Sequence, residues 1–129
     1  MSMDEIGIIV SSDDPKSLAM ATNLGHVALT MDTDVFLYFT FDGLTHLTEG
    51  ETDLSSIRPL LDEGMPNPYD MLDQLIADGG DAVTSVACTT TLDMLQWDRE
   101  AIDDDVTTKF AGAVTFLEAA EDADQVFTF

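Results

Sequence analysis

Short apolar runs alternate with segments of helical periodicity along this chain, and this alternation is the feature that most constrains the fold. Four runs rich in β-branched or aromatic residues predict strands that are buried on both faces. These runs are residues 5–10, 35–39, 82–87 and 125–129. Alternating strands and helices favour an α/β fold, a layered sandwich in which a mainly parallel sheet carries helices on both faces.

The segments between these strands predict the helices. A first helix is expected from Pro15 to about residue 31, because Pro suits the first helical position and residues 11–14 offer several N-caps. A second begins near Pro68 and stops at Gly79. Residues 92–95 are helical in pattern, and a last helix is predicted from about 108 to 121. Residues 49–68 predict a surface excursion with about one helical turn near Leu60.

Length and composition predict one domain that spans residues 1–129. The 129 residues, 45% of them hydrophobic, suffice for one core and not comfortably for two. No apolar stretch has membrane-spanning length, and no signal peptide is evident at the N-terminus. A single cysteine excludes an internal disulfide framework. We therefore expect a cytoplasmic protein.

The charge balance is extreme, with 26 acidic residues against four basic ones and a net charge of −22. Four scattered cations cannot form a phosphate-binding surface, so the charge argues against nucleic-acid partners. An anionic membrane would repel the chain for the same reason. Such a charge is typical of a protein from a halophilic organism, because concentrated salt screens the self-repulsion. A group of acidic residues is therefore weak evidence for a metal or acid–base site.

Polar residues follow the first three predicted strands, at the edge where parallel α/β sheets bind ligands. The thiol of Cys88 is the candidate reactive group, and His46 follows Asp42 by one helical turn. The residues expected to bind a substrate at this edge are Ser11, Ser12, Thr40, Asp42, His46, Thr89 and Thr90.

Two interpretations of Cys88 stay open on position alone. A predicted helix begins next to it, and the unpaired N–H groups of a helix start stabilise a thiolate. The many carboxylates of the chain act in the opposite direction, and no basic residue is adjacent to Cys88 in sequence. Free cysteines are also commonly buried as small hydrophobic residues. Cys88 is therefore either a working thiolate or a part of the core.

Other chemistries lack support in the sequence. Two histidines and one cysteine show no metal-ligand spacing, so no metal is expected. There is no glycine-rich phosphate loop, nucleophilic serine motif or defensible pair of catalytic carboxylates. We therefore expect no cofactor.

Several segments resemble the DsrE/DsrF/DsrH-like family. "VACTTTLDML" and "FAGAVTFLEAAEDADQVFTF" resemble its carboxy-terminal half. "FLYFTFDGL" resembles the strand-to-loop signature of its first half, and "IIVSSDDPKSLAMATNLGHVAL" its opening strand and helix. The resemblance covers nearly the whole chain except about residues 49–80. It implies a small α/β sandwich that assembles as a homo-oligomer, a trimer or hexamer.

The resemblance also implies a function. Family members are associated with sulfur relay, in which a cysteine persulfide accepts and passes on sulfane sulfur or thiosulfate, and Cys88 occupies the position of that cysteine. The partner would be a sulfur donor or acceptor protein or a low-molecular-weight thiol. Whether the chain acts as a sulfurtransferase or as a carrier stays open. Two alternatives remain: a non-catalytic oligomeric module that binds a small ligand, and a one-cysteine thiol peroxidase.

The net charge of −22 predicts a strong dependence of stability on salt. The thermal unfolding midpoint should rise as sodium chloride increases from about 0.1 M to about 1 M, where the screening length falls from about 10 Å to about 3 Å. Circular dichroism during heating measures this midpoint. Full stability in salt-free buffer would contradict the expected halophilic origin.

Overall fold

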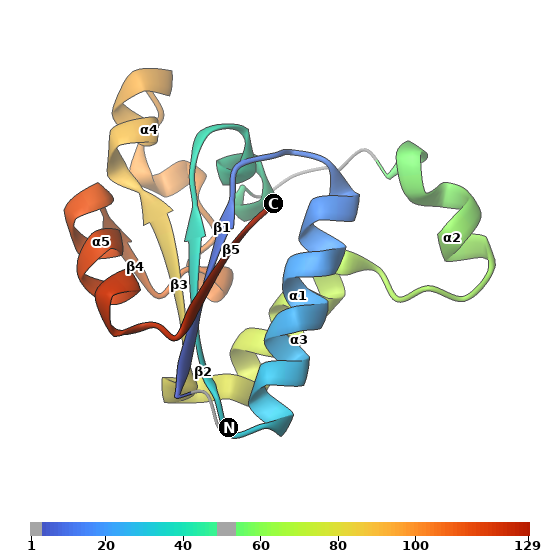
Figure 1. The fold of residues 1–129 in the computed structure, drawn as a ribbon. Helices are drawn as coiled ribbons and strands as arrows, with labels where there is room; N and C mark the ends of the chain where they lie inside the picture. Colours follow the sequence, from blue (N-terminus) through green and yellow to red (C-terminus); the bar gives the residue numbers. More distant parts are fainter. Residues whose placement is uncertain (1–3, 49–53) are drawn as a thin grey trace.

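The computed structural model describes residues 4–48 and 54–129, and a five-stranded parallel sheet forms its centre (Figure 1). The sheet has the order β4-β3-β2-β1-β5. Every pair of neighbouring strands is parallel. The strands are β1 Glu5–Val10, β2 Asp34–Phe39, β3 Val83–Cys88, β4 Lys109–Ala111 and β5 Gln125–Thr128. The predicted α/β fold with a mainly parallel sheet is confirmed.

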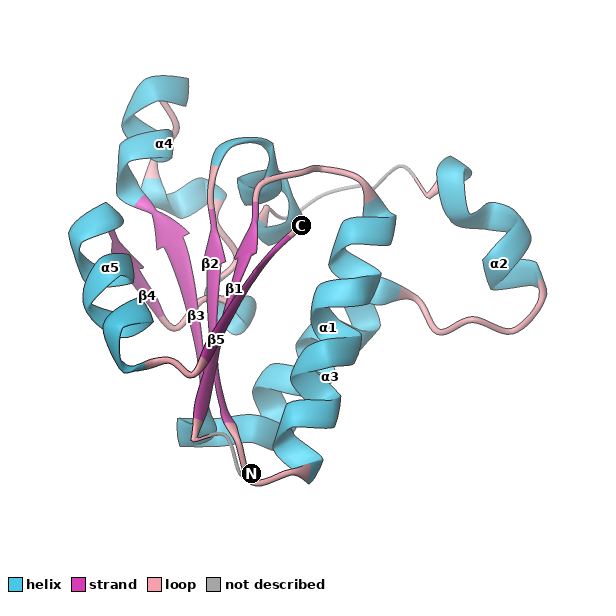
Figure 2. Ribbon diagram, in the orientation of Figure 1, coloured by secondary structure: helices cyan, strands magenta, loops and turns pink. Residues whose placement is uncertain are grey.

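Helices cover both faces of the sheet, as expected. The helices are α1 Pro15–Thr30, α2 Arg58–Asp62, α3 Pro68–Gly79, α4 Thr89–Leu95 and α5 Ala113–Asp122. From β1 to β4 the chain steps across the sheet in one direction, and it then returns past all four strands to place β5 beside β1. Right-handed crossovers in opposite directions leave their helices on opposite faces. Accordingly, α1 and α3 lie on one face and α5 on the other (Figures 1 and 2).

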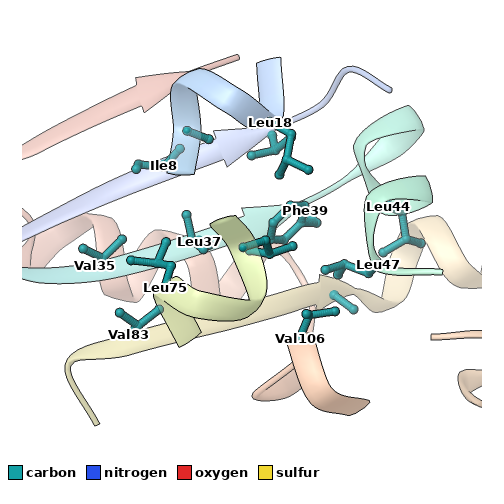
Figure 3. Packing of buried hydrophobic residues seen from close by; sticks show 14 of the residues in the cluster. Ile8, Leu18, Val35, Leu37, Phe39, Leu44, Leu47, Leu75, Val83 and Val106 are labelled. Carbon is teal, nitrogen blue, oxygen red and sulfur yellow. The ribbon is translucent and has the colours of Figure 1, made fainter. Parts of the chain in front are cut away.

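The main core lies between the sheet and the α1–α3 layer (Figure 3). Alternate residues of the three central strands point into it, among them Ile8, Leu37 and Val83. Leu18 of α1 and Leu75 of α3 pack against them, and both are fully buried. This layer holds most of the buried apolar surface.

The opposite face carries a smaller cluster under α5. Its buried members are Phe36, Tyr38, Val86 and Cys88, and Phe116 of α5 packs on them. The Phe116 ring stacks on the Tyr38 ring with centroids 4.8 Å apart. No residue of α5 is itself buried. This helix therefore covers the second cluster with far less burial than α1 and α3 provide on the first.

Most predicted elements agree with the structure to within one or two residues. The expected helix over residues 108–121 is wrong at its start, because residues 109–111 form β4 and α5 begins only at Ala113. Phe110 and Val114 are four residues apart, a spacing that also fits one continuous helix. Pairing of β4 with β3 decides the outcome, since Phe110 lies opposite Ala87 in the register. Strand Val83–Cys88 also extends one residue further than predicted and includes the thiol.

The surface excursion between β2 and α3 contains the predicted helical turn, which is α2 at Arg58–Asp62. A 3₁₀ turn, Ser55–Ile57, precedes it, and Ile57 is buried. The first part of the excursion, residues 49–53, and the first three residues of the N-terminal stretch lie outside the described residues. Within the described parts of the chain, no helix is long and apolar enough to cross a membrane.

Gly43 holds the chain after β2 against the end of β1. It lies in a 3₁₀ segment, Phe41–Leu47, and a Cβ at this position would stand 2.0 Å from the carbonyl oxygen of Val10. That oxygen already accepts a hydrogen bond from the backbone N–H of Thr40. Only glycine permits this approach, which fixes the loop that follows β2.

Gly43→Ala should therefore lower the free energy of unfolding by about 2 kcal/mol or more, because backbone atoms must move apart. Urea denaturation measures the change. Gly7→Ala is the matched control, since its Cβ would meet Val126 at an ordinary 3.5 Å. Equal effects of the two substitutions would show that the close approach at Gly43 is not a constraint.

Candidate functional site

Cys88 is the last residue of β3 and immediately precedes α4, at the carboxyl edge of the sheet (Figure 2). Its side chain is 3% exposed and belongs to the cluster under α5. The thiol is therefore both at the edge where such sheets bind ligands and shielded from solvent.

Tyr38 donates a hydrogen bond to the sulfur of Cys88, with 3.1 Å between Oη and Sγ. Tyr38 lies on the neighbouring strand β2, opposite Val86 in the register, so its ring shares the α5 face with Cys88. Burial raises the pKa of Tyr38, and the hydrogen bond to Cys88 raises it further. The phenol consequently stays protonated and remains a donor to the sulfur.

Two threonine side chains adjoin the thiol from opposite elements. The hydroxyl oxygens of Thr40, after β2, and Thr91, in α4, lie 3.2 Å apart and share a hydrogen bond. The backbone N–H of Phe41 donates to Thr91 Oγ1 at 3.0 Å. Phe41 makes this contact with a φ of +48°, a left-handed conformation that costs a non-glycine residue about 1–2 kcal/mol. The loop after β2 and the start of α4 are thus joined beside the sulfur.

The balance of these contacts lowers the pKa of Cys88 to about 7. Burial is the largest single effect and raises the pKa, because it penalises the thiolate. The hydrogen bond from the Tyr38 hydroxyl and the polar groups of Thr91 and Thr40 near the sulfur act in the opposite direction, and together they exceed the effect of burial. Neutral donors alone therefore hold a substantial thiolate fraction near neutral pH.

Thr89 and Thr90 extend the site toward α5. A Cβ built on Gly112 would lie 3.6 Å from Oγ1 of Thr89 and 3.8 Å from Oγ1 of Thr90. Gly112 is the N-cap of α5, and no side chain caps the N–H groups of the first turn. Two hydroxyls and the uncapped first turn of α5 thus lie next to Ala111, the residue opposite Cys88 in the register.

A second group of predicted binding residues forms a separate structural contact. His46 is 3% exposed, and its Nε2 donates to the carbonyl of Ser12 at 2.8 Å. Its Nδ1 therefore accepts from the Tyr69 hydroxyl at 2.7 Å. Burial lowers the pKa of His46, although the Ser12 hydrogen bond and the carboxylates of Asp13 and Asp14 oppose this. Both ring nitrogens are occupied in joining three segments of the chain.

The two serines likewise bond to the protein. Ser11 donates through its N–H and hydroxyl to the carbonyl of Phe129, and the Ser12 hydroxyl accepts from the N–H of Asp14. Asp42 is exposed. The structure thus brings Thr40, Thr89 and Thr90 to the Cys88 end of the sheet, and it engages Ser11, Ser12 and His46 in internal contacts. A substrate-binding role for these residues stays a prediction.

Comparison with known proteins identifies the family. The sequence model of the DsrE/DsrF-like family matches residues 4–129. The chain belongs to the DsrE/DsrF-like family. A solved protein of unknown function from Methanobacterium thermoautotrophicum has the same fold with a TM-score of 0.64, over 96% of this chain and 98% of that one. Their sequence identity is 12%, so this likeness concerns the fold alone. A search of curated proteins gives no significant match.

Two residues beside the thiol, Tyr38 and Thr91, are not among the predicted binding residues. Tyr38 lies in the run "VFLYF", which predicts a strand that is apolar on both faces. Its hydroxyl is the sequence feature that could have identified Tyr38, because a buried tyrosine requires a hydrogen-bond partner. Thr91 is the third residue of α4, and Cys88 is the N-cap of that helix. The spacing of three residues, which places two side chains on one side of a helix, was the signal for Thr91.

We expect Tyr38→Phe to raise the pKa of Cys88 by about 1 to 2, because a hydrogen bond to a charged group contributes about 1.5–3 kcal/mol. Thr91→Val should act in the same direction. The thiolate absorbance in the ultraviolet, measured against pH with Cys88→Ser as the blank, reports the pKa without requiring access to the sulfur. Thr90→Val is the matched control and should leave the midpoint near 7. Unchanged midpoints in both Tyr38→Phe and Thr91→Val would refute the hydrogen-bonded thiolate.

Proposed function

We propose that this protein is a sulfur-relay protein of the DsrE/DsrF-like family, in which Cys88 carries sulfane sulfur as a persulfide. The observation that supports this most directly is the hydrogen-bonded thiol with a pKa of about 7. A purely structural cysteine needs no such donors, since burial alone would keep it protonated and inert. Membership of the family adds the expectation of sulfur transfer.

The transfer step can be written without an external oxidant. The Cys88 thiolate attacks the outer sulfur of thiosulfate, a sulfur–sulfur bond forms, and sulfite leaves with the electron pair of the broken bond. Attack on a polysulfide follows the same course and releases a shorter polysulfide. The thiolate of a partner then attacks the terminal sulfur, takes it as its own persulfide and returns Cys88 as the thiolate.

The residues around the thiol suit such an anionic substrate. The hydroxyls of Thr89 and Thr90 and the uncapped first turn of α5 offer neutral donors to oxyanion oxygens. The Tyr38 and Thr91 donors that stabilise the thiolate would also stabilise the persulfide anion, which has a lower pKa than a thiol. The site therefore needs no basic residue, which suits a chain with four of them.

Access to the sulfur requires a local movement, because Cys88 is 3% exposed. We propose that α5 moves outward from the sheet. It covers the Cys88 cluster without a buried residue of its own, and the Phe116–Tyr38 stack is its main aromatic contact there. Gly112 at its start supplies a backbone position that tolerates rotation.

The assembly state is part of the proposal. Val114 and Leu117 on the outer side of α5 are 72% and 66% exposed, a large fraction for apolar side chains. Contact with a second copy in a homo-oligomer, a trimer or hexamer as the family resemblance implies, would cover them. We also propose a cytoplasmic location in a halophilic organism, in line with the charge of −22.

The test is the intact mass of the folded protein after exposure to thiosulfate or polysulfide in high salt. Wild type should gain one sulfur atom, which a reductant removes, and Cys88→Ser should gain none. Tyr38→Phe should load several-fold more slowly near pH 7, because less of its thiol is ionised. At a pH well above the raised pKa, loading of this variant should recover.

Absence of loading on the wild type at every pH, together with a folded protein by circular dichroism, would overturn the relay function. Loading of Cys88→Ser to the same extent would show that the added sulfur is not a Cys88 persulfide.

A further inference from the structure

A recess lies at the other end of α4 from Cys88. It has a volume of about 590 Å³ and is lined by Thr48, Gln96, Trp97, Asp98, Glu100 and Ala101. Helix α4 ends at Leu95, and Gln96 then turns the chain with a left-handed φ of +58°. The N–H groups of Gln96 and Trp97 bond back to the carbonyls of Asp93 and Leu92. This closed helix end fixes where Trp97 stands.

The lining combines an indole ring with two carboxylates. Trp97 is partly buried and packs against the main core, and these contacts fix its position. Asp98 and Glu100, which both follow Trp97 in sequence, are exposed, and the last carbonyls of α4 add partial negative charge. Arg99 stands between the two acids in sequence, but its guanidinium lies over the Phe110 ring, 4.9 Å from the centroid. The lining itself contains no basic side chain.

This combination matches one type of side chain. An aromatic surface accommodates the aliphatic stem or the guanidinium plane of Arg or Lys, and carboxylates accept hydrogen bonds from its charged end. Met94 and Leu95 of α4 adjoin the recess in sequence and are 65% and 44% exposed. They supply the apolar surroundings that a protein contact requires and that a free inorganic cation does not.

We propose that this recess is a docking site for a partner protein, which inserts an arginine or lysine side chain between Trp97, Asp98 and Glu100 and places apolar residues on Met94 and Leu95. A guanidinium fits best, because its planar fork can stack on the indole and bond both carboxylates. The two carboxylates of the lining select a basic partner at short range, where salt screens a charged contact least.

A second copy of this chain is a poor occupant on the same grounds. The chain has four basic residues. Arg99 already faces Phe110, and the ammonium of Lys109 lies 5.8 Å from the centre of the Phe36 ring. Only the exposed Lys16 and Arg58 remain for a contact of this kind between copies. A different protein with a basic surface offers more such side chains, and it is the occupant that we propose.

The inference goes beyond the sulfur-relay proposal and does not rest on it. The recess is separated from Cys88 by the length of α4, seven residues or about 10 Å of helix. A partner anchored there would lie along α4 toward the thiol. Binding itself requires no persulfide, so Cys88→Ser should bind the partner as wild type does.

Trp97 is the only tryptophan of the chain, so its fluorescence reports directly on the recess. The probe is the peptide acetyl-Leu-Arg-Leu-amide. Two control peptides carry citrulline, an uncharged isostere of arginine, or glutamate, a residue of opposite charge, in place of the arginine. The arginine peptide should change the Trp97 emission saturably, and the other two should not. The combined variant Asp98→Asn and Glu100→Gln should weaken binding of the arginine peptide by about ten-fold or more.

Asp93→Asn is the matched control, because it removes an exposed acid on α4 that does not line the recess. Equal weakening by Asp93→Asn, or equal binding of the citrulline peptide, would reduce the effect to general charge or apolar attraction and overturn the proposal. Sedimentation of the protein alone tests the other occupant. If the combined variant Asp98→Asn and Glu100→Gln dissociates an oligomer that the wild type forms, the recess is a contact between copies of this chain and not a docking site for another protein.

Discussion

The hydrogen bond from Tyr38 to Cys88 is the contact on which the site depends. A buried thiol among apolar residues resists ionisation, and the charges of this chain are overwhelmingly negative. The pKa of Cys88 nevertheless reaches about 7, because the Tyr38 hydroxyl donates to the sulfur and the polar groups of Thr91 and Thr40 lie near it. Such donors act at short range and need no counter-ion, so they suit a protein with few cations. Salt that screens surface charges would leave these buried contacts largely intact.

The fold supplies these donors through strand register. Parallel pairing of β2 with β3 places Tyr38 opposite Val86. Val86 is two residues before Cys88, so both side chains lie on the same face of the sheet. The chain after β2 then passes close to Val10, which only Gly43 allows, and brings Thr40 and the N–H of Phe41 to Thr91. The return crossover that places α5 on this face covers the cluster. A slip of one residue between β2 and β3 would remove Tyr38 from the sulfur entirely.

Sequence periodicity predicts much of this arrangement and omits its decisive contacts. The apolar runs predict the three central strands, and their carboxyl ends predict where Cys88, Thr40, Thr89 and Thr90 lie. The pattern does not distinguish β4 from the start of α5, because edge pairing of three residues is a tertiary effect. Tyr38 is hidden in an apolar run, since a side chain's partner across a sheet depends on register. His46 falls in the loop after β2 as expected, but its burial depends on Tyr69 in α3, 23 residues away.

One measurement tests most directly whether Cys88 is a working thiolate or part of the core. The rate of Cys88 modification by a small alkylating reagent is measured in the folded protein, in high salt, across increasing denaturant below the unfolding transition. A local opening of α5 exposes little surface, so the account predicts a rate that is nearly independent of denaturant and rises with pH around 7. A rate that increases with denaturant in step with global unfolding would contradict it, because Cys88 would then react only once the fold is lost.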